Sequence, residues 1–413
     1  MDVLQWTERL IALDSQNPGC GEGAVADAVE SACSALGFEV RRVELVPGRP
    51  NLFVTVDRGR GPHLGLCGHL DTKPIGQAIQ EWRSDPFRLT IEGNLAFGLG
   101  TSDMKGAIAA MLVALARFAD DGPSGTLTVA LTADEEQGST AGARALVAST
   151  SLPNFDALVI GEPSGIDTPW ESLHLVSRGI SCFDVEVRTQ QGHSGLSDRL
   201  GRNAVLVAAD LLEALPGLRP TVSDPGPVAC RPTVNPGMHI EGGVTFGTWP
   251  GWCTVGTEVR LVPGMDRDRV QRQVEDFVRG AIGEIAEATV RWRPGSMGWM
   301  PAVGLDPNAP IAQAAQRACV RVLGHELPVT AYPGGTDATY FMGEAGIPTI
   351  ASLGPGWLSV AHGANECVGL DQLETAVDLY TTLTREFLSP TPSAAETTVR
   401  RPLRETATPD AAS

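Results

Sequence analysis

The sequence predicts an α/β fold in two parts, a mixed-sheet α/β domain and an inserted α+β sandwich of the ferredoxin-like kind. Two observations carry this prediction. Short apolar runs bounded by turns are interleaved with helical patterns in the first half, and this alternation stops near residue 178 and resumes near residue 294. The length of 413 residues is enough for two domains that each bury a core.

The first half alternates helices and strands. Residues 23–36 carry apolar side chains at helical spacing, whereas residues 38–43 alternate with the period of two that is typical of a strand. Residues 106–115 are too long and too rich in alanine for a strand and predict a buried helix. Further apolar runs predict strands at 51–56, 63–67, 126–131 and 157–160. Strands interleaved with helices indicate a sheet that is at least partly parallel or mixed.

The pattern changes in residues 178–293. Strands are predicted at 179–188, 238–240, 254–261 and 288–293, and helices at 203–215 and 266–282. This order suits helices on one face of an antiparallel sheet. The first pattern returns with a helix at 310–323, a strand at 348–353 and a helix at 370–387. We therefore expect residues 178–293 to be inserted into a domain of residues 1–177 and 294–388, followed by a disordered tail at 389–413.

The composition argues against several classes of partner. The chain has 49 acidic and 31 basic residues, a formal net charge of −18, and so acidic a surface repels nucleic-acid phosphates and anionic lipids. The sequence has no apolar run of about 18 residues and no signal-peptide layout at its start. We therefore expect a cytoplasmic enzyme without a nucleic-acid or membrane partner. The eight cysteines form no C-x-x-C pair and are expected to be buried thiols.

Side chains that can bind metal ions follow the predicted strands. In Gly68-His69-Leu70-Asp71-Thr72 the alternation of a strand places His69 and Asp71 on one face, where Asp71 could fix the imidazole tautomer. Asp103 lies in a glycine-rich turn that lacks the residues of a dinucleotide fingerprint or a P-loop. Each motif alone has a simpler explanation, a hydrogen-bonded turn at His69 and a helix N-cap at Asp103.

Acidic residues and a second histidine follow other strands. Asp134, Glu135 and Glu136 end a core strand, and their mutual repulsion costs free energy unless cations or solvent neutralise it. Glu162 follows the next strand and His362 a later one, and such strand ends line the ligand crevices of α/β sheets. Two imidazoles and several carboxylates without thiols predict a pair of divalent ions, Zn²⁺ above all, roughly 3.5–4 Å apart with a bridging carboxylate.

Taken in order, the motifs resemble those of the dinuclear-zinc M20 amidohydrolases, in particular the acetylornithine deacetylase and succinyl-diaminopimelate desuccinylase group. The resemblance covers about residues 60–385. The motifs are Gly68-His69-Leu70-Asp71-Thr72, Glu81-Trp82-Arg83-Ser84-Asp85-Pro86-Phe87, Ser102-Asp103-Met104-Lys105-Gly106, Asp134-Glu135-Glu136, Gly161-Glu162-Pro163, Gly192-His193-Ser194 and His362-Gly363-Ala364-Asn365-Glu366. The resemblance implies that the inserted part is a dimerisation and lid domain.

The resemblance implies which residues bind each of the two metal ions. Asp103 would bridge two zinc ions, with Co²⁺ or Mn²⁺ as alternatives to Zn²⁺. His69 and Glu162 would complete one site, and Glu136 and His362 the other.

The resemblance also implies the chemistry. Asp71 would orient His69, and Glu135 would be the general base toward a water bridged by the two zinc ions. The implied reaction is hydrolysis of the amide bond of an N-acyl amino acid or short peptide-like compound with a free carboxylate. The alternatives are a glutamate-carboxypeptidase-like peptidase and a non-catalytic binding module with the same fold.

Three residues of the inserted part have implied roles. His193 would reach the active site of the other subunit of a homodimer and stabilise the oxyanion. Arg260 and Asn235 would hold the substrate carboxylate and the scissile carbonyl. The simpler alternatives are a solvated arginine and an asparagine that shapes a turn.

Two departures from many relatives bear on the substrate. Lys73 stands where an apolar residue is common, and its cation could meet an anionic substrate group or point to solvent. Thr339 stands where many deacylases have arginine. The identity of the acyl group and of the amine therefore stays open.

Overall fold

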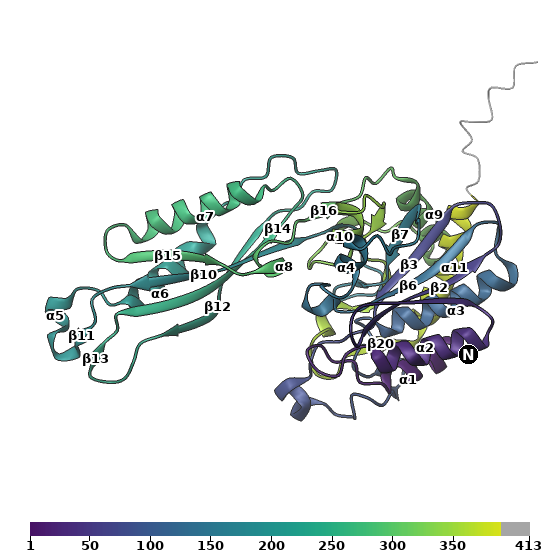
Figure 1. The fold of residues 1–413 in the computed structure, drawn as a ribbon, viewed down its shortest axis with the longest axis horizontal. Coiled ribbons are helices and arrows are strands. Elements are labelled where there is room, and N and C mark those ends of the chain that lie inside the picture. The colour runs from purple at the N-terminus through teal and green to yellow at the C-terminus, as the bar shows by residue number, and fades with distance from the viewer. Residues whose placement is uncertain (390–413) are drawn as a thin grey trace, which may run out of the picture.

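The structure is a computed structural model, and it describes residues 1–389. The predicted tail at 389–413 lies outside the described residues except for its first position. The described chain forms an elongated molecule in which a larger unit, holding both ends, stands beside a smaller unit formed by the middle of the sequence (Figure 1). An α/β unit with an inserted α+β unit is the fold class that the sequence predicts, and the structure confirms it.

A mixed sheet organises the larger unit. Its strands lie in the order β1 (Glu39–Val46), β2 (Arg49–Asp57), β6 (Thr126–Thr132), β3 (His63–His69), β7 (Ala157–Ile160) and β18 (Thr349–Ile350). Neighbours from β6 to β18 are parallel, whereas β1, β2 and β6 pair antiparallel. The parallel strands carry their carboxyl ends to one edge of the sheet, where residues from distant segments can meet.

Both faces of this sheet are buried. Leu64 and Leu66 of β3 point into one core, and Cys67 points into the other. The first core is completed by α1 (Val3–Ile11), α2 (Gly23–Ala35), α3 (Lys105–Asp121), α9 (Pro310–Leu323) and α11 (Leu370–Leu388). The second core is completed by α4 (Ala143–Ala148) and α10 (Ala338–Gly343). Because both faces are covered, β3 and β6 are buried along nearly their whole length.

The smaller unit, residues 179–292, is here called the inserted unit. Its antiparallel sheet has the order β12 (Thr233–Gly242), β14 (Trp252–Leu261), β10 (Gly179–Arg188) and β15 (Glu287–Trp292). Helices α6 (Ala204–Ala214) and α7 (Arg267–Ile282) pack on Val185 and Val255 at one face. Alternation along β14 places Glu258 and Arg260 on the opposite face. The short strands β11 (Gly192–His193) and β13 (Thr248–Trp249) form its tip (Figure 1).

Several predicted elements coincide with observed ones, and others differ in extent. The predicted helix at 310–323 and strands at 157–160 and 179–188 are α9, β7 and β10. The strand predicted at 348–353 is only Thr349–Ile350, because Gly354–Trp357 forms β19, which pairs with β8 (Pro163–Gly165) in another sheet. Helix α1 is not among the predicted elements, although Asp2 caps it. None of the helices in residues 1–389 has the length and apolar character needed to cross a membrane.

Candidate metal centre

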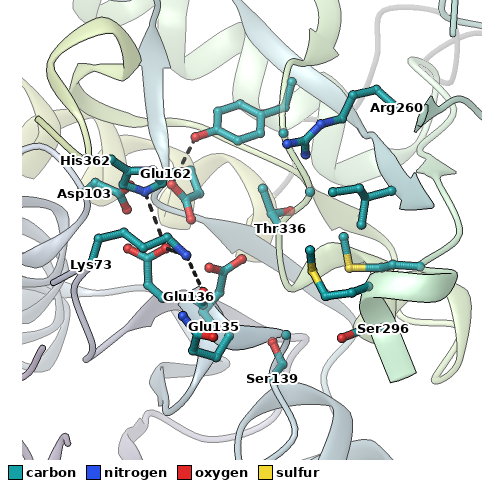
Figure 2. A pocket seen from close by; sticks show the side chains of 18 of the residues that line it. Lys73, Asp103, Glu135, Glu136, Ser139, Glu162, Arg260, Ser296, Thr336 and His362 are labelled. Atoms are coloured by element: carbon teal, nitrogen blue, oxygen red, sulfur yellow. Dashed lines mark hydrogen bonds and ion pairs between the residues drawn. The ribbon is translucent and has the colours of Figure 1, made fainter. Parts of the chain in front are cut away.

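A pocket of about 440 Å³ opens where the larger unit meets the base of the inserted unit. Acidic side chains and His362 line the side formed by the larger unit, and Arg260 of the inserted unit lies across from them (Figure 2). The acids follow β6 and β7 or precede α3, so three separate segments bring them to the sheet edge. The pocket is therefore built at the edge where strands of an α/β sheet commonly hold ligands.

The carboxylate of Asp103 lies between two imidazoles. Its Oδ1 is 3.0 Å from Nε2 of His69, and its Oδ2 is 3.0 Å from Nε2 of His362. Oε1 of Glu162 is 3.4 Å from Nε2 of His69, and Oε2 of Glu136 is 3.4 Å from Nε2 of His362. The five predicted ligands thus form two groups that share Asp103, in the same pairs that the resemblance implies.

The donor set fits two divalent cations. In the described part of the chain, ligand atoms of His69, Asp103 and Glu136 lie within 4.8 Å of one another, as do those of His69, Glu135 and Glu162. Oε1 of Glu136 is buried without a hydrogen-bond partner among residues 1–389, which costs free energy unless a cation neutralises it. Imidazoles and carboxylates suit Zn²⁺, Co²⁺ and Mn²⁺.

Negative charge dominates this cluster. Burial alone would lower the pKa of His362, but its contacts with Asp103 and Glu136 raise that pKa to about 10. Burial would raise the pKa of Asp103, yet its hydrogen bonds with His362 and His69 hold it below the ordinary value. Burial and the charge of Asp103 raise the pKa of Glu162 to about 7. The carboxylates outnumber the imidazoles that could balance them, so the centre attracts cations.

Glu135 points into the pocket beside the ligands (Figure 2). It begins the short 3₁₀ helix η2 (Glu135–Gln137) directly after β6. Burial and the neighbouring carboxylates raise the pKa of Glu135 well above its usual value, which suits a group that must accept a proton. The preceding Asp134 adopts a left-handed φ of 63° and binds Thr140 Oγ1 at 2.6 Å. Asp134 is therefore a structural acid, and the two acids after it face the pocket.

Asp71 supports both His69 and the loop that carries Glu135 and Glu136. Its carboxylate accepts hydrogen bonds from the backbone N–H groups of Glu135 and Glu136, both at 3.2 Å, and from Asn17 Nδ2 at 2.8 Å. Nδ1 of His69 lies 2.9 Å from the carbonyl oxygen of Asp71 and 3.6 Å from its carboxylate. The backbone of Asp71 thus makes the closer contact with the imidazole, while its side chain holds the loop of the acids.

Glu366 anchors the turn that carries Asp103. Its buried carboxylate accepts hydrogen bonds from the backbone N–H groups of Gly100 at 2.9 Å, Ser102 at 2.8 Å and Asp103 at 2.9 Å. The sequence motif that begins at His362 contains Glu366, but nothing in the motif assigns this role. One segment therefore supplies both the predicted ligand His362 and the anchor of the turn that carries Asp103.

The side chain of Lys73 points to Glu136, one of the predicted metal ligands. Its ammonium lies 3.1 Å from Oε2 of Glu136 and also donates to the Glu136 carbonyl oxygen. This contact gives the cation a partner within the chain, and Lys73 also lines the pocket with 30% of its side chain exposed, so a role toward an anionic substrate group stays a prediction. Lys73 offsets part of the charge of the acidic cluster and holds the main chain of Glu136 in place.

The three predicted residues of the inserted unit lie in different places. Arg260 lines the pocket (Figure 2). Asn235 lies on β12, next to the strand of Arg260, and donates a hydrogen bond to Glu258. His193 is exposed on β11 at the tip, far from the larger unit, where its Nδ1 accepts from the N–H of Gly195 at 3.0 Å (Figure 1). Within a single subunit, His193 is therefore not close to the five predicted metal ligands.

Two further pocket residues are not predicted from the sequence. The Tyr332 hydroxyl donates to Oε2 of Glu162 at 3.2 Å, which leaves Oε1 facing His69. Tyr332 ends β17 (Val329–Tyr332), which reaches the site by pairing with β9 (Leu173–Ser177). No local sequence pattern therefore predicts that Tyr332 lies in the pocket. Glu258 has a local signal, because it lies two residues before Arg260 on an alternating strand.

Known proteins resemble this chain along almost its whole length. The family model described as Peptidase family M20/M25/M40 matches residues 65–386. An acetylornithine deacetylase from Vibrio vulnificus is 31% identical over 399 residues, 94% of this chain and 98% of the relative. A succinyl-diaminopimelate desuccinylase from Dinoroseobacter shibae is 28% identical over 399 residues, 94% of this chain and 100% of the relative. An M20 family metallo-carboxypeptidase from Sulfolobus solfataricus has a similar fold, with a TM-score of 0.74 at 21% identity over 94% of this chain and 99% of that one.

Replacing Glu366 by alanine is expected to loosen the turn of Asp103. Three backbone donors would lose a buried, charged acceptor, so we expect the free energy of unfolding to fall by about 3 kcal/mol. Because the bridging carboxylate would lose its fixed position, Zn²⁺ affinity should fall by about tenfold or more. Denaturant unfolding and calorimetric Zn²⁺ titration measure the two effects.

The matched control is Glu374→Ala, which removes an exposed glutamate of α11. This control should leave both quantities unchanged. Wild-type stability and wild-type Zn²⁺ affinity in Glu366→Ala would contradict the anchoring role.

Proposed function

The chain belongs to peptidase family M20/M25/M40, and from this premise we propose that it hydrolyses the amide bond of an N-acyl amino acid with a free carboxylate, using two divalent cations. The observation that carries the proposal is the carboxylate of Asp103 between the imidazoles of His69 and His362, with Glu135 beside it. The relatives that match nearly the full chain are named as a deacetylase and a desuccinylase, which supports deacylation as the reaction.

Each side chain of the centre has a role in this proposal. The ligands would be His69, Asp103, Glu136, Glu162 and His362, with Zn²⁺ as the first candidate ion. Bound cations would polarise the scissile carbonyl and lower the pKa of water. Glu135 would take a proton from the attacking water and deliver it to the leaving amine, and its raised pKa supports proton acceptance.

The other side of the pocket would recognise the substrate. Arg260 faces the ligands across the pocket, and a guanidinium binds a carboxylate through paired hydrogen bonds (Figure 2). Asn235, on the neighbouring strand, would bind the scissile carbonyl. A pocket of about 440 Å³ is of the size that holds a small molecule. Residues 178–293 would act as the lid over a catalytic domain of residues 1–177 and 294–388.

A homodimer through the inserted unit is part of the proposal. Among the described residues, β12 is an edge strand with exposed Met238 and Ile240, and Val244 and Phe246 are exposed in the turn that follows. Exposed apolar side chains beside an unpaired strand edge favour association. Residues 178–293 contain 13 basic and 14 acidic residues, so little net charge opposes it. Such a dimer would let the exposed His193 reach the partner's pocket.

A substrate panel tests the proposed reaction. Zinc-reconstituted protein is expected to hydrolyse N-acetyl or N-succinyl amino acids, and to prefer them at least about tenfold over the matching α-carboxamides, since Arg260 would lose its ionic partner. Amine release measures kcat/KM, and metal-free protein is the control. Turnover confined to C-terminal glutamate amides would instead support a carboxypeptidase-like activity, and no turnover of any compound would support a binding module.

Glu135→Gln tests the general base. The variant should keep its metal content and lose at least roughly a hundredfold in turnover, because an amide cannot accept the proton. Steady-state kinetics and metal analysis measure the two properties. Glu344→Gln, at an exposed glutamate, is the control. Undiminished turnover in Glu135→Gln would remove this residue from the mechanism.

Mixed dimers test whether His193 acts across the interface. One subunit carries His193→Ala and the other Glu135→Gln, and each homodimer is expected to be inactive. If His193 serves the partner, one site of the mixed dimer is complete and about half of the wild-type activity returns.

The control dimer pairs a wild-type subunit with a subunit carrying both substitutions. Action across the interface predicts an inactive control, whereas action within one subunit predicts an active control and an inactive mixed dimer. Activity measured on purified heterodimers separates the two outcomes.

A further inference from the structure

Glu258 connects the two residues that the proposed function assigns to substrate binding. Its Oε1 accepts a hydrogen bond from Nε of Arg260 at 2.8 Å and another from Nδ2 of Asn235 at 2.9 Å. The side chain of Glu258 is 14% exposed and lines the pocket. A single oxygen atom thus joins one side chain from β12 and one from β14.

The backbone places these three residues together. Glu258 and Arg260 are two positions apart on β14, so their side chains leave the same face of the sheet. Asn235 of β12 is the register partner of Glu258. The register then shifts between Pro236 and His239, beyond this pair. The contact is therefore set by regular strand pairing rather than by a loop.

We propose that Glu258 is a positioning residue, which presets Arg260 and Asn235 for the carboxylate and carbonyl of the substrate. The proposal rests on the proposed function and deepens it. An ionised carboxylate only accepts hydrogen bonds, so Asn235 must turn its NH₂ group toward Glu258 and keep its second N–H free. Arg260 commits only Nε–H, which leaves the N–H groups of its two terminal nitrogens for a substrate carboxylate.

Orientation, rather than stability, is what this contact supplies. The ion pair is partly exposed, with 29% of the Arg260 side chain accessible, and such pairs contribute little to folding. A long arginine side chain that is already held in place loses less rotamer freedom when it binds substrate. The charges of Glu258 and Arg260 also cancel, so recognition of an anion depends on the direction of the terminal N–H groups.

Kinetics with paired substrates test this role. The compounds are an N-acyl amino acid and its α-carboxamide, and the measured quantity is the ratio of their kcat/KM values. We expect Glu258→Ala to reduce this preference by about tenfold, with unchanged metal content and unfolding midpoint. Glu258→Gln retains one acceptor oxygen, so its preference should lie between those of the wild type and Glu258→Ala. Glu287→Ala, at an exposed acid on β15 of the same sheet, is the matched control.

An unchanged preference in Glu258→Ala, while the wild type hydrolyses the N-acyl amino acid, would overturn the positioning role and leave the proposed function standing. Crystal structures of the wild type and Glu258→Ala decide the same question without turnover. We expect the Arg260 guanidinium and the Asn235 amide to leave their present orientations in the variant. Retention of both orientations would overturn the proposal, even if no substrate in the panel were hydrolysed.

Discussion

The carboxylate of Asp103, shared between His69 and His362, is the interaction on which the rest of the site depends. A carboxylate can serve two imidazoles at once only if its position and its plane are both fixed. Glu366 fixes them through the main chain, because it binds the N–H of Asp103 itself and two more N–H groups of the same turn. Helix α3 begins two residues later and packs in the core of the larger unit, so the turn cannot drift.

The inserted unit forms one side of the pocket, and the chain that leads out of it packs against the larger unit. Helix α8 (Gly295–Gly298) lies against the loop that carries the acids, since a Cβ at Gly138 would come within 2.3 Å of Ser296 Oγ. Gly138 also has a φ of 94°, so both its conformation and its contact favour glycine. The return of the chain from the inserted unit thus touches the loop of Glu135. This close approach links the residues proposed to recognise the substrate to those proposed to perform the chemistry.

The sequence predicts the side chains that gather at the centre better than it predicts their supports, and the reason is physical. His69, Asp103 and Glu162 each follow or precede a core element whose apolar pattern is strong, so their place at one sheet edge follows from topology. Tyr332 acts through one hydrogen bond to Glu162, and Asn17 through hydrogen bonds to Asp71 and Asp134, both from segments without a periodic pattern. Glu258 is intermediate, because strand alternation places it beside Arg260 although no motif marks it. The direction of Lys73 depends on a contact with Glu136, which sequence alone does not show.

The clustered carboxylates of the pocket repel one another, and the surrounding groups offset this repulsion only partly. Asp71 holds the backbone of Glu135 and Glu136, and Lys73 reaches Glu136, but the carboxylates of Glu135 and Glu162 still have raised pKa values. A group whose pKa is raised by burial and by neighbouring charges has an unfavourable free energy in its ionised form. Cations that bind the folded centre and not the unfolded chain would remove this cost, so metal occupancy and folding stability would rise together. The same negative potential that opposes folding would therefore supply the affinity for the ions that the chemistry requires.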